Sequence, residues 1–162
     1  MNVLVLSDSH AGLSFMRAAI QSLQPNALVH LGDYYEDGET IAFENPNLTM
    51  YQVPGNCDMM RCFGKPETLC LTIRGVKILM AHGHQFGVKG SLVKLLAEAR
   101  RLGAQVVLYG HTHEADCHQE EDGLWVINPG SCGSYSGSVA LLELQPQTVV
   151  GCRILTADAI TW

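Results

Sequence analysis

The chain has 162 residues, a length that suits one domain. Hydrophobic residues make up 47% of it and charged residues 16%, so it can bury a core and is not a disordered chain. Ten Lys and Arg residues against sixteen Asp and Glu residues give a formal net charge of −6, which argues against binding to long nucleic acids or anionic membranes.

Short apolar runs alternate with glycine-rich or polar turns through the first two thirds of the chain. Several runs are continuous and rich in Val and Leu, which is typical of strands buried on both faces. We predict strands at residues 3–6, 27–31, 49–53, 76–81 and 105–109.

Two helices are predicted between these strands. Residues 13–23 and residues 91–102 carry apolar side chains at spacings of three and four, which place them on one face of a helix. Gly90 or Ser91 can cap the start of the second helix, and Gly103 can end it. Strands that alternate with helices indicate an α/β core with parallel strands.

The last third of the chain indicates two hairpins. Residues 114–120 and 124–128 flank a Glu-Asp-Gly turn, and residues 138–144 and 148–155 flank a Gln-Pro-Gln turn. We therefore expect a sheet that begins parallel and ends antiparallel, packed against a second sheet, within a single domain that spans residues 1–162.

Cysteine usage and the N-terminus favour a soluble, cytoplasmic protein. The six cysteines include no CxxC pair and no zinc-finger spacing, so we expect reduced thiols. The first residues contain neither a basic leader nor a long apolar stretch, so we predict no signal peptide and no membrane span.

Residues that commonly bind metals follow all five predicted strands. In an open α/β sheet the carboxyl ends of parallel strands lie along one edge, so side chains that are far apart in sequence would converge there. Two pairs are spaced i, i+2, which in extended backbone points both side chains the same way. The set comprises Asp8 and His10, Asp33, Asn56 and Asp58, His82 and His84, and His111 and His113.

The ordered motifs resemble those of the calcineurin-like metallophosphoesterases. The short length and the Gly-Asn-Cys-Asp variant are similar to the small phosphodiesterases of the YfcE type. The resemblance runs from residue 3 to about residue 131. It rests on Asp8-Ser9-His10, Gly32-Asp33, Gly55-Asn56-Cys57-Asp58, His82-Gly83-His84, Gly110-His111-Thr112-His113 and Asn128-Pro129-Gly130-Ser131.

The resemblance implies an α/β fold in which two mixed β-sheets pack as a sandwich flanked by helices. It also implies two divalent metal ions, with Mn²⁺ favoured and Zn²⁺, Fe²⁺, Co²⁺ or Ni²⁺ as alternatives, and a hydroxide between them that attacks phosphorus. Asp33 would bridge the two ions. One ion would be held by Asp8, His10, Asp33 and His113, and the other by Asp33, Asn56, His82 and His111.

Five further positions bear on catalysis or on contact with the substrate. Many relatives carry His after the Gly-Asn pair, where this chain has Cys57, and a thiol is a weak hydrogen-bond donor and a poorly matched acid at neutral pH. We expect Asp58 to orient a neighbouring ligand. His84 is a candidate for a phosphate contact or proton donor, with a backbone-bonded histidine as the alternative. Arg61 and Lys65 either touch the substrate or are only solvated.

The sequence therefore predicts a dinuclear, metal-dependent phosphodiesterase that acts on small phosphodiesters or phosphoesters. Two alternatives stay open: a non-catalytic, protein-binding scaffold of the same fold, and a phosphomonoesterase. We expect no long nucleic acid and no membrane as partners, and the resemblance suggests a homodimer.

Overall fold

Ten strands and three α-helices make up the regular structure of residues 1–133 and 136–160, the part of the chain that this computed structural model describes. The strands are β1 (Asn2–Leu6), β2 (Ala27–His30), β3 (Thr49–Gln52), β4 (Thr68–Ile73), β5 (Val76–Ala81), β6 (Val106–Leu108), β7 (Asp116–Gln119), β8 (Trp125–Asn128), β9 (Ser138–Gln145) and β10 (Thr148–Thr156). The α-helices are α1 (Leu13–Leu23), α2 (Tyr35–Glu44) and α3 (Val93–Arg101). Short 3₁₀ turns occupy Asn56–Asp58, His84–Phe86 and Ala157–Ala159.

The strands form two mixed five-stranded sheets. The first sheet has the order β10-β9-β1-β2-β3, with β1, β2 and β3 parallel and the β9–β10 hairpin antiparallel. The second sheet has the order β4-β5-β6-β8-β7, with β5, β6 and β8 parallel and both edge strands antiparallel. The expected sandwich of two mixed sheets is thus confirmed.

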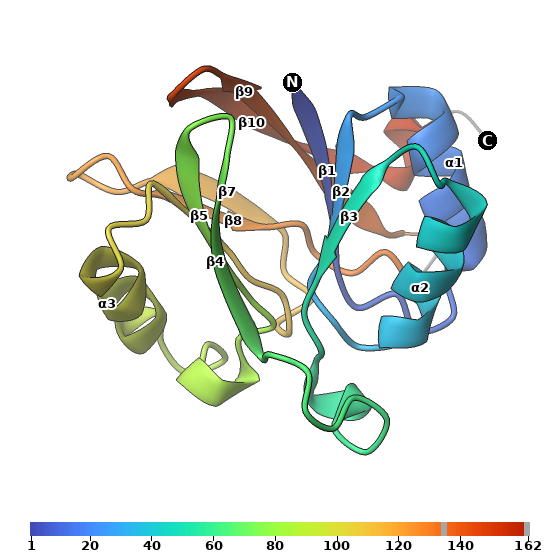
Figure 1. The fold of residues 1–162 in the computed structure, drawn as a ribbon, viewed down its shortest axis with the longest axis horizontal. Helices are drawn as coiled ribbons and strands as arrows, with labels where there is room; N and C mark the ends of the chain where they lie inside the picture. The colour runs from blue at the N-terminus through green and yellow to red at the C-terminus, as the bar shows by residue number, and fades with distance from the viewer. Residues whose placement is uncertain (134–135, 161–162) are drawn as a thin grey trace.

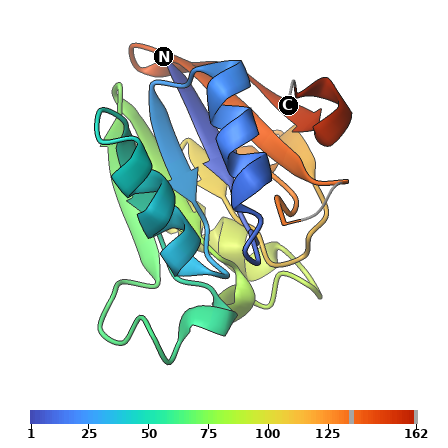
Figure 2. The same ribbon diagram turned by 90° about the vertical axis from the view of Figure 1, so that its right-hand side faces the viewer.

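Four layers follow from how each strand uses its two faces. Val3 and Val5 pack into the core between the sheets, whereas Leu4 and Leu6 pack against Phe15 and Met16 of α1. Burial on both faces explains the continuous apolar run of β1. The outer face of the second sheet packs in the same way against α3. Figure 1 shows α1 and α2 against the first sheet and α3 against the second, and Figure 2 shows α1 and α2 side by side.

Three expectations about the elements need correction. The five strands that precede the candidate residues do not share one sheet edge, because β1, β2 and β3 lie in the first sheet and β5 and β6 in the second. Helix α2 and edge strand β4 were not predicted. Helix α3 begins at Val93, two residues after the predicted start, although Gly103 does follow its end with a φ of 69°.

Two chemical properties of the described residues bear on the environment of the protein. All six cysteines are free thiols. None of the helices in the described part of the chain combines the length and the apolar character that a membrane crossing requires.

Candidate metal centre

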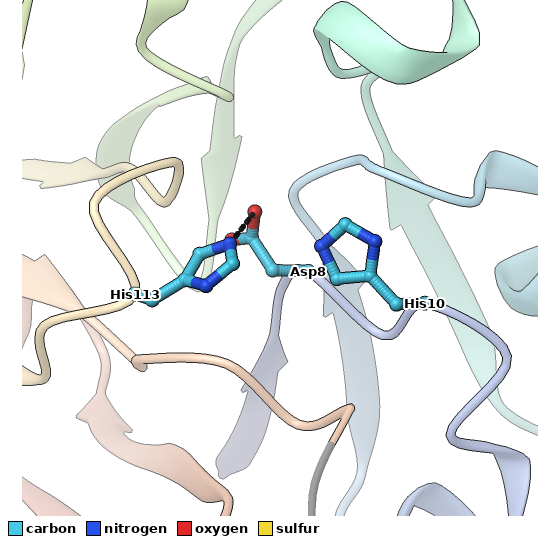
Figure 3. A group of neighbouring side chains, drawn as sticks. All are labelled: Asp8, His10 and His113. Carbon is cyan, nitrogen blue, oxygen red and sulfur yellow. Dashed lines mark hydrogen bonds and ion pairs between the residues drawn. The ribbon is translucent and has the colours of Figure 1, made fainter.

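The first group of candidate ligands joins the loops that follow β1 and β6. Oδ1 of Asp8, which is fully buried, lies 3.1 Å from Nε2 of His113. His10 approaches from the opposite side (Figure 3). One ligand atom of each of the three residues lies within 4.8 Å of the others, so a single ion can contact all three.

The second group joins the two sheets. Nε2 of His82, which follows β5, lies 3.5 Å from Oδ1 of Asp33 and 3.8 Å from Oδ1 of Asp8. Asp33 follows β2 in the first sheet, and all three residues are buried. The two groups share Asp8 and therefore adjoin each other.

The remaining two candidates approach the same nitrogen of His82. Its Nε2 is 3.0 Å from Oδ1 of Asn56 and 3.2 Å from Nδ1 of His111. Nε2 of His10 lies 3.9 Å from Oδ2 of Asp33. The structure thus brings all seven residues that we predicted as metal ligands into one contiguous group.

The protonation of His82 shows that a cation fits this group. Its Nδ1 lies 2.8 Å from the carbonyl oxygen of Leu31, which only accepts, so Nδ1 carries the proton and Nε2 presents a lone pair. That lone pair faces the amide oxygen of Asn56 and the carboxylate of Asp33. All three groups donate electron pairs, and no proton lies between them to form a hydrogen bond. Nε2 of His10 is also buried without a hydrogen-bond partner in the described part of the chain. Divalent cations satisfy such nitrogen and oxygen donors.

The backbone under the group is strained. Five of the seven candidate ligands have a positive φ, which is uncommon for residues other than glycine. Such conformations cost free energy and cluster at functional sites. The extended backbone that we expected for the i, i+2 pairs is therefore wrong, and left-handed turns aim these side chains instead. The five are Asp8 (φ 53°), His10 (φ 42°), Asp33 (φ 58°), His111 (φ 69°) and His113 (φ 62°).

Asp58 holds the turn that carries Asp33. Its Oδ2 accepts the backbone N–H groups of Asp33 (2.9 Å) and Gly55 (2.8 Å), and its Oδ1 accepts those of Tyr34 and Tyr35 (both 2.9 Å). A buried carboxylate with four such bonds fixes a backbone and has little capacity left for a substrate.

A second buried carboxylate holds the loop that carries His10. Oδ2 of Asp37, on α2, accepts hydrogen bonds from Oγ of Ser9 (2.6 Å) and from the backbone N–H of Ala11 (2.8 Å). Nε2 of His30 lies 3.1 Å from the same serine oxygen. Both residues that flank His10 are thus bonded to one carboxylate oxygen.

Burial and neighbouring charges set the ionisation of the group. Burial raises the pKa of Asp33, but His82, the Cys57 N–H and His10 outweigh this effect and hold the pKa below its usual value. Burial and the nearby His82 lower the pKa of both His84 and His111. Near pH 7 Asp33 is therefore charged and His84 and His111 are neutral, the forms that bind metals.

The other predicted positions lie at different distances from the group. The ring centroid of His84 is 5.5 Å from that of His82, and Nδ1 of His84 is buried without a hydrogen-bond partner among the described residues. Cys57 is exposed, and its N–H donates to Oδ1 of Asp33 (3.0 Å). Arg61 and Lys65 turn to carboxylates of α2 instead.

Sequence reasoning missed the residues that support the group. Asp37 lies in a helix with little amphipathic pattern, and Ser131, whose Oγ donates to the carbonyl of Asp8 (2.8 Å), lies in a loop. Tyr34, whose ring meets the edge of His10 at 5.3 Å, follows Asp33 directly. Of these, only Ser131 belonged to a recognised motif.

Comparison with known proteins gives a consistent result. The family model described as "Calcineurin-like phosphoesterase superfamily domain" matches residues 1–147. "Probable metallophosphoesterase YsnB" of Bacillus subtilis is 37% identical over 135 residues, which cover 81% of this chain and 75% of that protein. "Phosphodiesterase MJ0936" of Methanocaldococcus jannaschii is 31% identical over 151 residues, which cover 83% and 86%.

Solved structures share the fold. A predicted phosphoesterase from Streptococcus pneumoniae has a TM-score of 0.79 and 26% identity, over 99% of this chain and 92% of that chain. Vps29 from Entamoeba histolytica, a single mutant, has a TM-score of 0.71 and 25% identity, over 96% and 99%.

Proposed function

Because the chain belongs to the calcineurin-like phosphoesterase superfamily, we propose that it hydrolyses phosphodiesters at a centre of two divalent metal ions. The observation that carries the proposal is the contiguous group of seven nitrogen and oxygen donors, contributed by both sheets. The family resemblance implies seven ligand positions, and this chain has a competent residue at each of them.

The directions in which the two carboxylate oxygens of Asp33 point support this residue as the bridge between the ions. Its Oδ2 faces His10 and its Oδ1 faces His82, so each oxygen points to a different part of the group. Oδ1 of Asp33 accepts one hydrogen bond, from the N–H of Cys57, whereas Oδ2 of Asp8 accepts two, from the hydroxyl of Ser7 and the backbone N–H of His111. Only Oδ1 of Asp8 is directed at the imidazoles of the group.

The donors divide into two sets. We assign Asp8, His10, Asp33 and His113 to one ion and Asp33, Asn56, His82 and His111 to the other. The absence of thiolates from both sets favours Mn, Fe, Zn or Co over softer metals. Among these ions the family resemblance favours Mn²⁺. Bound divalent ions would neutralise charge on the phosphoryl oxygens and lower the pKa of a bound water.

The chain's own residues orient the reactants. Asp58 is a positioning residue, since its four backbone bonds fix the turn that presents Asp33. His84 is a candidate for a contact to the phosphoryl group, because the centroid of its ring lies 5.5 Å from that of His82. The four hydrogen bonds of Asp58 support its role, and neither role assigns a proton transfer.

A preference for diesters follows from the charges near the group. A phosphodiester carries one negative charge, whereas a monoester carries about two near neutral pH. The two cations of the loop that follows Asp58 are paired with carboxylates of α2, Arg61 with Glu36 and Lys65 with Glu39. The site therefore has no extra side-chain cation from this loop for a dianion.

The likeness to Vps29 favours a second candidate, a scaffold of this fold that binds other proteins. Metal-dependent turnover separates the two. The protein is stripped of metal with a chelator, supplied with Mn²⁺ and assayed with bis-p-nitrophenyl phosphate and with mono-p-nitrophenyl phosphate. We expect the diester to be hydrolysed faster, and only with metal.

Each other outcome excludes a part of the proposal. Failure to hydrolyse either ester with any divalent ion would refute an enzyme and leave the scaffold. Faster hydrolysis of the monoester would identify a phosphomonoesterase. Asp33→Asn should abolish turnover while circular dichroism shows a folded protein, and full activity in this variant would contradict a bridging role.

A further inference from the structure

A cavity of about 350 Å³ adjoins the candidate metal centre on the side of His10 and His113. These two histidines line the cavity and also belong to the group that contains Asp8. A phosphoester held at this group therefore has one of its alcohol parts next to the cavity. The other described residues that line it are Ser131, Gly133, Ser136 and Ser138.

Two of the serine hydroxyls already donate their protons to backbone carbonyl oxygens. Oγ of Ser131 donates to the carbonyl oxygen of Asp8 (2.8 Å), and Oγ of Ser138 donates to that of Pro129 (2.7 Å). A hydroxyl has one proton and two lone pairs, so towards a ligand these oxygens act as acceptors. The N–H of Gly133 uses one lone pair of Ser131 (3.3 Å) and leaves the other.

The hydrogen-bond acceptors that line the cavity determine which ligand groups it can bind. Phosphate and carboxylate oxygens are acceptors themselves and gain nothing from these two serines. None of the six described lining residues is Lys or Arg, so an anionic group finds no side-chain cation there that is charged at all pH values. Ligand hydroxyls, in contrast, can donate to Ser131 and Ser138.

We propose that this cavity binds the polyhydroxylated alcohol part of the substrate, of the glycerol or ribose kind. The inference rests on the proposed function for the anchoring of the phosphoryl group. A water molecule occupies about 30 Å³ in the liquid, so the cavity holds roughly a dozen. That space accommodates a three-carbon polyol or a pentose ring, and the shared chemistry is a neutral chain or ring with several hydroxyls.

Non-hydrolysable phosphonates test the site without turnover. 3,4-Dihydroxybutylphosphonate has the shape of glycerol 3-phosphate with a C–P bond, and butylphosphonate lacks only its two hydroxyls. Isothermal titration of the Mn²⁺-loaded protein should show that the dihydroxy compound binds about 5- to 10-fold more tightly, as expected for one or two hydrogen bonds. The phosphonate analogue of ribose 5-phosphate is compared with the dihydroxy compound. Tighter binding of the ribose analogue indicates a pentose site, and tighter binding of the dihydroxy compound indicates a glycerol site.

Substitutions in the cavity test whether it is the source of the difference in affinity between the two phosphonates. Ser136 is exposed, so Ser136→Phe should fill the cavity without unfolding the protein and reduce the ratio of the two affinities to about 1. Ser131→Ala provides a second test and should reduce the ratio by removing one acceptor. Ser22→Phe, on the exposed face of α1, is the matched control and should keep the ratio of the parent.

The outcomes separate this inference from the proposed function. Equal affinities in the parent, or a preference that survives Ser136→Phe, would overturn the polyol site alone. If neither phosphonate binds, the anchoring of the phosphoryl group at the metal centre is refuted, and the polyol site that rests on it is refuted as well. A protein that discriminates between the phosphonates but hydrolyses no phosphodiester would keep the site and refute the catalytic proposal.

Discussion

Asp58 shows how one side chain can determine the geometry of the candidate site. Its carboxylate is 4% exposed and accepts four backbone N–H groups from the turns after β2 and β3. Hydrogen bonds to a charged group contribute about 1.5–3 kcal/mol each, and donors left unsatisfied in a buried position are costly. The fold around Asp33 therefore depends on this negative charge.

Asp58→Asn should lower the free energy of unfolding by about 3 kcal/mol, because an amide offers one acceptor oxygen and directs its NH₂ at two of the four donors. Urea denaturation measures the change. Asp122→Asn is the control, since Asp122 is exposed and its ion pair with Arg100 lies at the surface, where such pairs add little to stability. A loss for Asp58→Asn no larger than that of the control would contradict the positioning role.

His30 predicts a specific dependence of stability on pH. Burial lowers its pKa to about 4, and nearby carboxylates offset only part of that effect. The unfolded chain binds this proton at about pH 6.5, so between pH 6.5 and 4 the unfolded state holds more protons and the free energy of unfolding falls as the pH falls. The expected total loss is roughly 3 kcal/mol, complete near pH 4.

The variant His30→Gln isolates this contribution, because a glutamine amide can still donate to Ser9 but does not titrate. Chemical denaturation of both proteins between pH 7 and pH 4 provides the measurement. The parent should lose about 3 kcal/mol more than the variant. Parallel curves would show that His30 is not held neutral by the fold.

Cys57 bears on the leaving group. It lies beside Asp33 at the position where the family resemblance implies an imidazole donor, and a thiol is a weak donor. The value of kcat/KM should therefore rise steeply as the pKa of the leaving phenol falls in a series of aryl diesters. Cys57→His should flatten this dependence, and an equally steep slope in both proteins would contradict the argument.

At the scale of elements, α2 holds the loop between β1 and α1. Asp37 of this helix accepts hydrogen bonds from Ser9 and Ala11, the two neighbours of His10, whose backbone is in the left-handed region. The helix thus links the packing of the first sheet to the orientation of His10, a proposed metal ligand.

Asp37→Asn should weaken Mn²⁺ binding about 10-fold, the size of effect typical of residues that support a metal ligand. Isothermal titration with Mn²⁺ measures the affinity. Glu39→Gln is the matched control on the same helix, because Glu39 is exposed and pairs with Lys65 outside the candidate centre. Equal affinities for the two variants would show that α2 does not position His10.

Elements with a strong local pattern could be predicted, and those without one could not. Helix α1 has the predicted bounds, residues 13–23, because its apolar stripe packs on β1. Helix α2 contains Gly38 and buries the polar Asp37, so its pattern is weak. Strand β4 lies at a sheet edge and alternates exposed with half-buried residues, which produced no continuous apolar run.

At the scale of the whole molecule, the candidate site depends on contacts that the sequence does not specify locally. The motifs after β1, β2, β3, β5 and β6 identified all seven proposed ligands. Their convergence results from two sheets that face each other, as in the bond from His82 to the carbonyl of Leu31 in the other half of the fold. Register between sheets and left-handed turns arise from tertiary packing, which no local pattern encodes.

The net charge of −6 is compatible with a small anionic substrate. The proposed ligand set contains only two carboxylates, those of Asp8 and Asp33, and the other five ligands are neutral. Two divalent ions (+4) with two carboxylates (−2) give a local charge of about +2. An acidic chain can thus attract a phosphodiester to one cationic site while it repels long polyanions.

Activity as a function of bound Mn²⁺ per chain tests the two-ion account most directly. Metal-stripped protein is titrated with Mn²⁺, and hydrolysis of bis-p-nitrophenyl phosphate is measured beside the metal content of the same samples. We expect hydrolysis to increase until two ions are bound per chain and to be absent without metal. Full activity in the presence of excess chelator, or a maximum at one ion per chain, would contradict the account.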